Sequence, residues 1–214
     1  MKKKEFLAWN ERMFRKYNNL RMYNHPNPLI RYTENKRVLS VLKGVKNAER
    51  VLDVGCGEGF VLSRINSKLR VGVDISETAL KRVPPSDSQI LVMADAEALP
   101  FSDSFFDAAV CTEVLEHCQN PKKVLIELRR AVISGGRIVL SIPNEPLINF
   151  IKNVAWNLGL FGFLFQNIPR RQDEEWHLHS FDINKLKKMA EGLVEIELIE
   201  AVPFWFLPVR YVVF

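Results

Sequence analysis

The chain has 214 residues, of which 47% are hydrophobic and 26% charged, enough to bury the core of one domain, 1–214, without splitting. Three cysteines, Cys56, Cys111 and Cys118, are an odd number without metal-like spacing. This argues against a disulfide framework and indicates a reducing, cytoplasmic location. Met1 is followed by lysines and a mixed helical pattern, not by an apolar run, so we expect no secretory signal.

Charge is unevenly distributed along the chain. Residues 1–50 hold 13 Lys and Arg against 4 Asp and Glu, a net charge of +9, which leaves −4 for the rest. An apolar stripe recurs at helical spacing between these basic residues and predicts an amphipathic helix. The stripe consists of Phe6, Trp9, Met13, Tyr17 and Leu20. A second helix is expected from about Ile30 to Val45, after the Pro26-Asn27-Pro28 turn.

The segment V-L-D-V-G-C-G-E-G at Val51–Gly59 predicts a buried strand that stops at glycines. Such glycines allow a tight turn and bring backbone against a ligand. Asp53 and Glu58 flank the turn, whereas a phosphate cradle would end in Gly-Lys-Ser/Thr. A nucleoside with a cationic or neutral tail therefore fits this turn better than a triphosphate.

A second short strand, Val71–Val73, ends in Asp74. This acid follows the glycines by about 20 residues, the spacing at which a carboxylate binds a ribose diol. The alternative role is the N-cap of a helix at Glu77–Val83, which Ser76 fills better. We therefore interpret Asp74 as a ribose-binding carboxylate.

The rest of the chain continues this alternation of strands and helices. After a first strand at Val51–Val54, we expect strands at Ile90–Met93, Ala108–Cys111 and Ile138–Ser141, helices at Pro121–Val132 and Ile183–Glu191, and closing antiparallel strands at Val194–Glu200 and about Val209–Phe214. The alternation predicts an α/β fold with a Rossmann-like, seven-stranded, mostly parallel sheet and an antiparallel last strand. Helices should cover both faces, and ligands should bind at the carboxyl ends of the strands.

Three further motifs follow in order. They are D-A-E-A-L-P-F at Asp95–Phe101, S-F-F-D-A-A-V-C-T-E-V-L-E-H at Ser104–His117 and L-R-R-A-V-I-S-G-G-R-I-V-L-S-I-P-N at Leu128–Asn144. With the glycine turn they cover about Arg50–Asn144, and this stretch resembles the class I S-adenosylmethionine (SAM)-dependent methyltransferases. More narrowly, it is similar to the group that contains the ubiquinone and menaquinone biosynthesis methyltransferases.

This resemblance implies a binding site for SAM and its product S-adenosylhomocysteine. It assigns ten residues to that site: Asp53, Gly55, Cys56, Gly57, Asp74, Ile75, Asp95, Ala96, Thr112 and Glu113. The glycine turn would line the methionine part, Asp53 would lie near the ammonium group, and Asp95 would hold the adenine. Residues 1–47 would form a helical cap over SAM; a patch for nucleic acid or anionic lipid is the alternative.

Two histidine clusters could carry chemistry: E-V-L-E-H at Glu113–His117 and W-H-L-H-S-F at Trp176–Phe181. A base is needed where the acceptor is an O–H group, and His117 and His179 are our candidates because neutral imidazole suits that role. The alternative is that these histidines only form hydrogen bonds with the backbone. Some relatives with Glu-x-x-Glu-His and a later His bind a divalent ion, but the same letters occur in relatives without one, so we expect no metal here.

Residues 145–172 form an insertion longer than a simple crossover needs. We expect one apolar helical face, with Leu147, Ile148, Ile151, Val154, Ala155 and Leu158, and one polar face, with Asn149, Lys152, Asn153 and Asn157. The next residues, Leu160–Phe165, are almost wholly apolar but too interrupted for a membrane span. The insertion is either a roof or membrane-surface foot for a lipophilic acceptor, or a packed lid or dimer contact.

The sequence therefore predicts a methyltransferase that acts on a small apolar or amphiphilic acceptor by O- or C-methylation. One alternative is an RNA or protein methyltransferase that uses the basic N-terminal segment. The chain lacks the Asn/Asp-Pro-Pro-Tyr/Phe motif of amino-directed base methylases, because Cys111–Val114 stands in its place, and we expect no nucleic-acid partner. Another alternative is a SAM-binding module without catalysis. The identity of the acceptor and the oligomeric state stay open.

Overall fold

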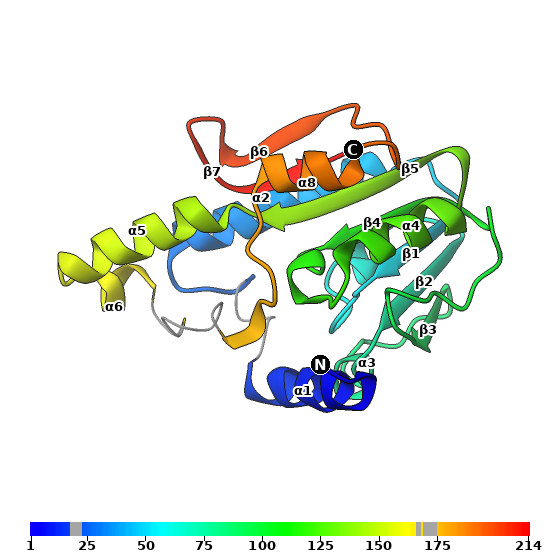
Figure 1. The fold of residues 1–214 in the computed structure, drawn as a ribbon, viewed down its shortest axis with the longest axis horizontal. Coiled ribbons are helices and arrows are strands. Elements are labelled where there is room, and N and C mark those ends of the chain that lie inside the picture. The colour runs from blue at the N-terminus through cyan, green and yellow to red at the C-terminus, as the bar shows by residue number, and fades with distance from the viewer. Residues whose placement is uncertain (18–22, 166–167, 169–174) are drawn as a thin grey trace.

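One seven-stranded sheet, in the order β3-β2-β1-β4-β5-β7-β6, organises the computed structural model, which describes residues 1–17, 23–165, 168 and 175–214 (Figure 1). The strands are β1 (Arg50–Val54), β2 (Leu69–Asp74), β3 (Gln89–Met93), β4 (Phe106–Thr112), β5 (Val132–Pro143), β6 (Ile199–Phe204) and β7 (Leu207–Val213). The first five strands are parallel, and β7 is antiparallel to both β5 and β6. The predicted mostly parallel sheet with an antiparallel last strand is confirmed.

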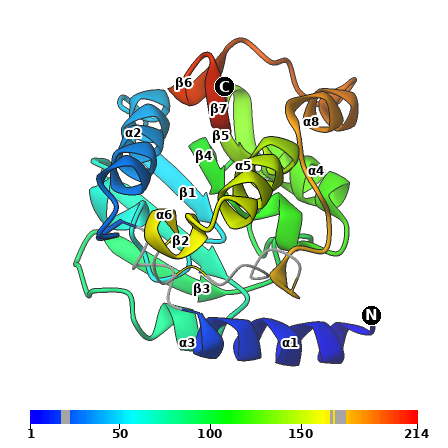
Figure 2. The same ribbon diagram turned by 90° about the vertical axis from the view of Figure 1, so that its left-hand side faces the viewer.

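Helices cover both faces of this sheet (Figure 2). Helix α2 (Pro28–Gly44) packs on one face, and helices α4 (Pro121–Ala131) and α8 (Ile183–Ala190) pack on the other. Successive strand residues point to opposite faces, so Val51 lies in the core under α2, whereas Leu52 lies in the core under α4. Burial on both faces explains why these strands read as apolar runs.

The remaining helical elements are short or lie away from the sheet layers. They are α1 (Lys3–Lys16), α3 (Glu77–Leu80), α5 (Glu145–Asn157), α6 (Phe161–Leu164) and the 3-10 turns Leu62–Arg64 and Leu115–His117. Among the described residues, no helix is long and apolar enough to cross a membrane.

Two helices begin at the capping signals of the sequence. The Asn120 side chain accepts a hydrogen bond from the Lys123 amide at 3.3 Å, and Pro121 opens α4. At α2, Asn27 caps the Leu29 amide at 2.9 Å, just before Pro28. Proline is tolerated in the first turn because the N–H group that it lacks would have no hydrogen-bond partner within the helix.

The predicted strand at Val194–Glu200 is wrong for most of its length, because β6 is Ile199–Phe204. The alternation of apolar and acidic residues there instead gives an extended segment, in which the Glu197 amide donates to the Phe214 carbonyl at 2.8 Å. The true strand contains Pro203, which breaks the apolar pattern. Proline is tolerated there because β6 is an edge strand whose pairing with β7 shifts register between Val202 and Pro203.

The two helices that the structure describes within residues 1–47 have different positions. Helix α1 lies beside α3 in both views, and Glu11 accepts a hydrogen bond from the Thr78 amide at 3.3 Å (Figures 1 and 2). Of its predicted stripe, Phe6, Met13 and Tyr17 are buried. Leu20 lies outside the described residues. Helix α2, by contrast, belongs to the layer that covers the sheet.

The core on the α4 face gives a direct test of the packing. Leu125 is 1% exposed in that core, whereas its neighbour Ile126 is 44% exposed. We expect Leu125→Ala to lower the free energy of unfolding by about 2–5 kcal/mol, because it leaves a cavity in a packed core. Ile126→Ala, the matched control, should lower it by less than about 1 kcal/mol. Urea denaturation measures both, and similar losses in the two variants would contradict this packing.

Candidate functional site

A cavity of about 440 Å³ lies at the carboxyl ends of the five parallel strands. Its lining includes all ten residues that the resemblance assigned to SAM: Asp53, Gly55, Cys56, Gly57, Asp74, Ile75, Asp95, Ala96, Thr112 and Glu113. His117 also lines it. His179 does not; its Nε2 lies 3.3 Å from the Gln119 carbonyl oxygen. The fold thus brings the ends of several strands around one space, although their residues are far apart in sequence.

The glycine turn is held against the end of β2. The amides of Gly55 and Cys56 both donate to the Val73 carbonyl, at 2.7 and 2.9 Å. Gly55 has a φ of +71°, and a Cβ there would lie 2.3 Å from a methyl group of Val114. Only glycine satisfies both the backbone conformation and the close approach.

Asp74 joins this turn to the helix that follows β2. Its carboxylate accepts hydrogen bonds from the Gly57 amide at 2.8 Å and from the Ser76 amide at 2.9 Å. Burial raises the pKa of Asp74 to about 6 in spite of these bonds. Each carboxylate oxygen can accept a further bond, so the group can still receive hydroxyl donors from a ligand.

Asp53 is a buried carboxyl group with one unsatisfied oxygen. It is 1% exposed, and Oδ2 has no hydrogen-bond partner among the described residues. Burial, together with the nearby carboxylate of Asp74, raises the pKa of Asp53 to about 8. A buried acceptor of this kind, in a cavity wall, fits a ligand that brings a cation or N–H donors. The acids and glycines at this end therefore suit the ammonium and ribose groups of SAM.

Helix α1 closes the cavity from the other side. Phe6, Asn10 and Phe14 line the cavity. The ring of Trp176 lies 5.6 Å from Tyr17 in a stacked arrangement and 5.3 Å from Phe14 edge-on. The helical spacing in the sequence predicted the apolar face of α1. It did not predict that this face would pack against Trp176, which lies more than 150 residues later in the chain.

Two ion pairs line the far end of the cavity, one buried and one partly exposed. Arg37 pairs with Glu34 at 3.0 Å and donates to the Tyr23 hydroxyl at 2.8 Å. Arg210 pairs with Glu113 at 2.7 Å. Although burial opposes it, Arg37 and Arg210 hold the pKa of Glu34 below its usual value. The sequence analysis named Glu113 but missed Glu34, Arg37 and Arg210, since neither α2 nor β7 carries a local motif that marks them.

Apolar side chains complete this far end. They come from the start of α2, from α5 and α6, and from the β6–β7 hairpin: Leu29, Ile30, Ile148, Ile151, Leu164 and Leu207. Lys152 also lines the cavity and is 6% exposed, so its predicted place on the polar face of the helix is wrong. Val154 and Leu158, predicted on the apolar face, are exposed because that part of α5 projects from the sheet (Figure 1). Residues 166, 167 and 169–172 of the predicted insertion lie outside the described residues.

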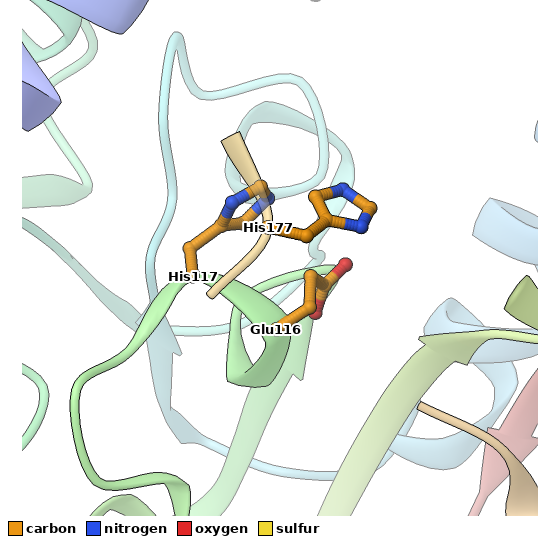
Figure 3. Close-up of side chains that lie close together, drawn as sticks. All are labelled: Glu116, His117 and His177. Atoms are coloured by element: carbon orange, nitrogen blue, oxygen red, sulfur yellow. The ribbon is translucent and has the colours of Figure 1, made fainter. Parts of the chain in front are cut away.

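Glu116, His117 and His177 form a cluster between these two ends (Figure 3). One ligand atom from each lies within 4.8 Å of the other two. Nδ1 of His117 lies 3.0 Å from the Trp176 carbonyl oxygen, and Nδ1 of His177 lies 2.7 Å from Oε1 of Glu145. Histidines that bind metals commonly use the second ring nitrogen in this way, so the cluster could hold a divalent ion. The expectation that none is bound stays a prediction.

The raised pKa of Asp53 makes the stability of the ligand-free protein depend on pH. An unfolded Asp titrates near pH 4. Between about pH 4 and the folded value, the folded state binds more protons, so the free energy of unfolding falls as pH rises. Asp53→Asn cannot titrate, and we expect its unfolding free energy to fall less steeply than that of the wild type between about pH 5 and pH 8. Urea denaturation across this range measures the slopes, with the exposed Asp87→Asn as control. Equal slopes for Asp53→Asn and the wild type would contradict the assignment.

A methyltransferase domain model matches residues 52–140 of the chain. The ubiquinone/menaquinone biosynthesis C-methyltransferase of Pectobacterium carotovorum is 30% identical over 168 residues, which are 65% of this chain and 67% of that protein. A tRNA (carboxymethyluridine(34)-5-O)-methyltransferase of Arabidopsis thaliana is 33% identical over 115 residues, 52% of this chain. The chain spans only 28% of the length of that protein and 44–45% of two other curated relatives.

A crystal structure of a SAM-dependent methyltransferase from Thermotoga maritima has the same fold. It is 20% identical, with a TM-score of 0.63, and the match covers 96% of this chain and 97% of that one. The shared fold, the glycine turn and the similarity over two thirds of the Pectobacterium relative agree. The chain belongs to the class I SAM-dependent methyltransferases, in the group that includes the quinone biosynthesis methyltransferases.

Proposed function

We propose that this protein transfers a methyl group from SAM to a small acceptor that combines an apolar body with a polar group, by O- or C-methylation. One observation carries the proposal. The glycine turn lines the same cavity as a region that combines apolar side chains with two ion pairs. SAM supplies an electrophilic methyl group on its sulfonium. Catalysis then depends mainly on holding the acceptor atom in line with that group.

The binding roles follow the chemistry of each strand end. Asp74, at the end of β2, would bind the ribose hydroxyls, and Asp53, near the end of β1, would bind the ammonium group, since both are buried carboxyls that line the cavity beside the glycine turn. Asp95 with Ala96 would hold the adenine beyond β3. Thr112 and Glu113, at the end of β4, would lie beneath the sulfonium. Glu113 is already engaged by Ser141 at 2.9 Å, which fixes its position.

An acceptor hydroxyl must lose a proton, and His177 is well placed to take it. The carboxylate of Glu145 lies 2.7 Å from its Nδ1, which favours the tautomer with the proton on that nitrogen. Nε2 is then the basic atom. His117, in the same cluster, is the second candidate. His179 bonds a backbone carbonyl outside the cavity, so we assign it no role in proton transfer.

Several observations favour a small acceptor over RNA. Lys3 lies 3.5 Å from Asp95, and Lys16 pairs with Glu175, so part of the basic charge of α1 is already engaged. Burial raises the pKa of the thiols of Cys56 and Cys111, which keeps them protonated and unsuited to act as nucleophiles on a base. The three cysteines are free and buried, which agrees with the proposed cytoplasmic location.

The cofactor part of the proposal is tested by binding. We expect Asp74→Ala to weaken the binding of S-adenosylhomocysteine by about 1–3 kcal/mol, since hydrogen bonds to a buried charged group are lost. Isothermal titration calorimetry measures this difference, and the exposed Asp87→Ala is the matched control. Wild-type affinity in Asp74→Ala would sink the ribose assignment.

The acceptor part is tested by a panel of compounds. Hydroquinones and catechols with alkyl tails, the kind of ring that quinone biosynthesis implies for the relatives, are offered with methyl-labelled SAM, beside an RNA stem-loop. We expect Ile148→Ser combined with Ile151→Ser to lower transfer to tailed acceptors by roughly tenfold or more, because the apolar wall is lost. The affinity for S-adenosylhomocysteine should stay unchanged.

Asn153→Ser, on the exposed side of the same helix, is the matched control for that variant. Labelling of RNA alone would replace this proposal with the nucleic-acid alternative. Labelling of nothing, with tight binding of S-adenosylhomocysteine, would favour a module without catalysis.

A further inference from the structure

We infer that the protein docks on membranes that contain anionic lipids through one face, from which a lipophilic acceptor enters the cavity. This inference rests on the proposed function. We define the docking face by the exposed apolar side chains of α5, α6 and the β6–β7 turn: Phe150, Trp156, Leu158, Phe163, Trp205 and Phe206.

The exposure of these side chains is high for residues of this kind. Trp205 is 85% exposed, Phe163 77% and Phe206 65%. Each of these side chains exposes apolar area to water. Transfer of that area to an apolar environment is favourable by a free energy of roughly 25 cal/mol per Å². Tryptophan at the tip of a turn is suited to the boundary between lipid and water, since its ring is apolar and its N–H is polar.

The two parts of the docking face project from the same side of the molecule. The β6–β7 turn and the α5–α6 arm both extend to the left in Figure 1, and that side faces the viewer in Figure 2. The start of α2 joins them. Tyr32 stacks on Phe204 at 5.9 Å, and the Asn27 side chain donates to the Leu164 carbonyl at 2.8 Å.

Helices α5 and α6 and strand β7, which carry or adjoin the docking face, also contribute side chains to the acceptor end of the cavity. Ile148 and Ile151 of α5, Leu164 of α6 and Leu207 of β7 are cavity residues, whereas the docking face carries their exposed neighbours. An acceptor that leaves the bilayer between these elements would stay in apolar contact along its path. This continuity is what links the surface to the chemistry.

Charge favours an anionic surface. Among the described residues of segments 28–36, 145–165 and 203–208, no Asp or Glu is exposed, because Glu34 and Glu145 are both buried. Arg31 is exposed and Lys36 half-buried at the edge of the docking face. Cations beside apolar anchors, with exposed carboxylates absent from these described segments, favour interfacial binding to anionic lipids. The projecting arm suits insertion into a soft bilayer better than a flat contact with a second copy.

Vesicle sedimentation tests the inference directly. The probes are vesicles of phosphatidylcholine alone and of phosphatidylcholine mixed with phosphatidylglycerol. We expect the wild type to bind the mixed vesicles more strongly, and the double variant Trp205→Ser, Phe206→Ser to bind them roughly tenfold or more weakly. The matched control is Ile90→Ser with Ile126→Ser, two residues 53% and 44% exposed on other elements.

Activity measurements separate this inference from the proposed function. The Trp205, Phe206 variant should lose transfer to a long-tailed acceptor held in vesicles, but keep transfer to a short-tailed acceptor dissolved in buffer. Wild-type protein that binds neither kind of vesicle, or a variant that binds like the wild type, would overturn the docking face. A variant that turns a dimer into a monomer in light scattering, with vesicle binding unchanged, would assign the face to a second copy. Failure to methylate either acceptor would instead count against the proposed function.

Discussion

The glycine turn after β1 is held to the end of β2 by a few backbone hydrogen bonds, and the site depends on them. The amides of Gly55 and Cys56 share the Val73 carbonyl, and the Gly57 amide binds the Asp74 carboxylate. Beside the turn that these bonds hold, Asp53 and Asp74 both line the cavity. Burial raises the pKa of both carboxyls in the ligand-free protein, and the carboxylate of Asp74 raises that of Asp53 further. A ligand with a cation and hydroxyl donors relieves the cost of this burial.

The two ends of the cavity use charge in different ways. At the turn, Asp53 has an oxygen without a partner among the described residues. At the far end, Arg37 with Glu34 and Arg210 with Glu113 are paired. Paired charges under apolar walls can orient a polar group of an acceptor without demanding a charged one. This contrast underlies our proposal of an amphiphilic acceptor.

Local signals in the sequence predicted much of the fold and the cofactor end of the site. The glycines, Asp74 and the Asn120-Pro121 start of α4 belong to short motifs. Such motifs can be recognised from the spacing of their residues in the sequence. The edge strand β6 was misplaced because it contains Pro203, which is tolerated at an edge strand and at a shift in register, and both are properties of the assembled sheet. Likewise, the contacts of Arg37 with Ser141 and of Trp176 with Tyr17 join distant parts of the chain, and no local pattern announces them.

The pair His177 and His179 shows the same limit at finer scale. The two residues are separated by one position in H-L-H, yet only His177 reaches the cavity. The His179 amide donates to the Glu116 carbonyl, and its ring lies beside the Gln119 carbonyl, whereas the His177 ring lies beside the Glu145 carboxylate. Lys152 shows a similar limit. A helical pattern separates the faces of a helix, but it does not predict how the helix is oriented on the rest of the fold, and Lys152 is buried in the cavity wall.

A crystal structure with bound S-adenosylhomocysteine tests the central claim most directly. We predict that its ribose hydroxyls bond the Asp74 carboxylate, and that its amino group lies beside Asp53 with the sulfur facing Glu116, His117 and His177. A ligand bound outside the glycine turn, or one that leaves Asp53 Oδ2 without a partner, would contradict the account.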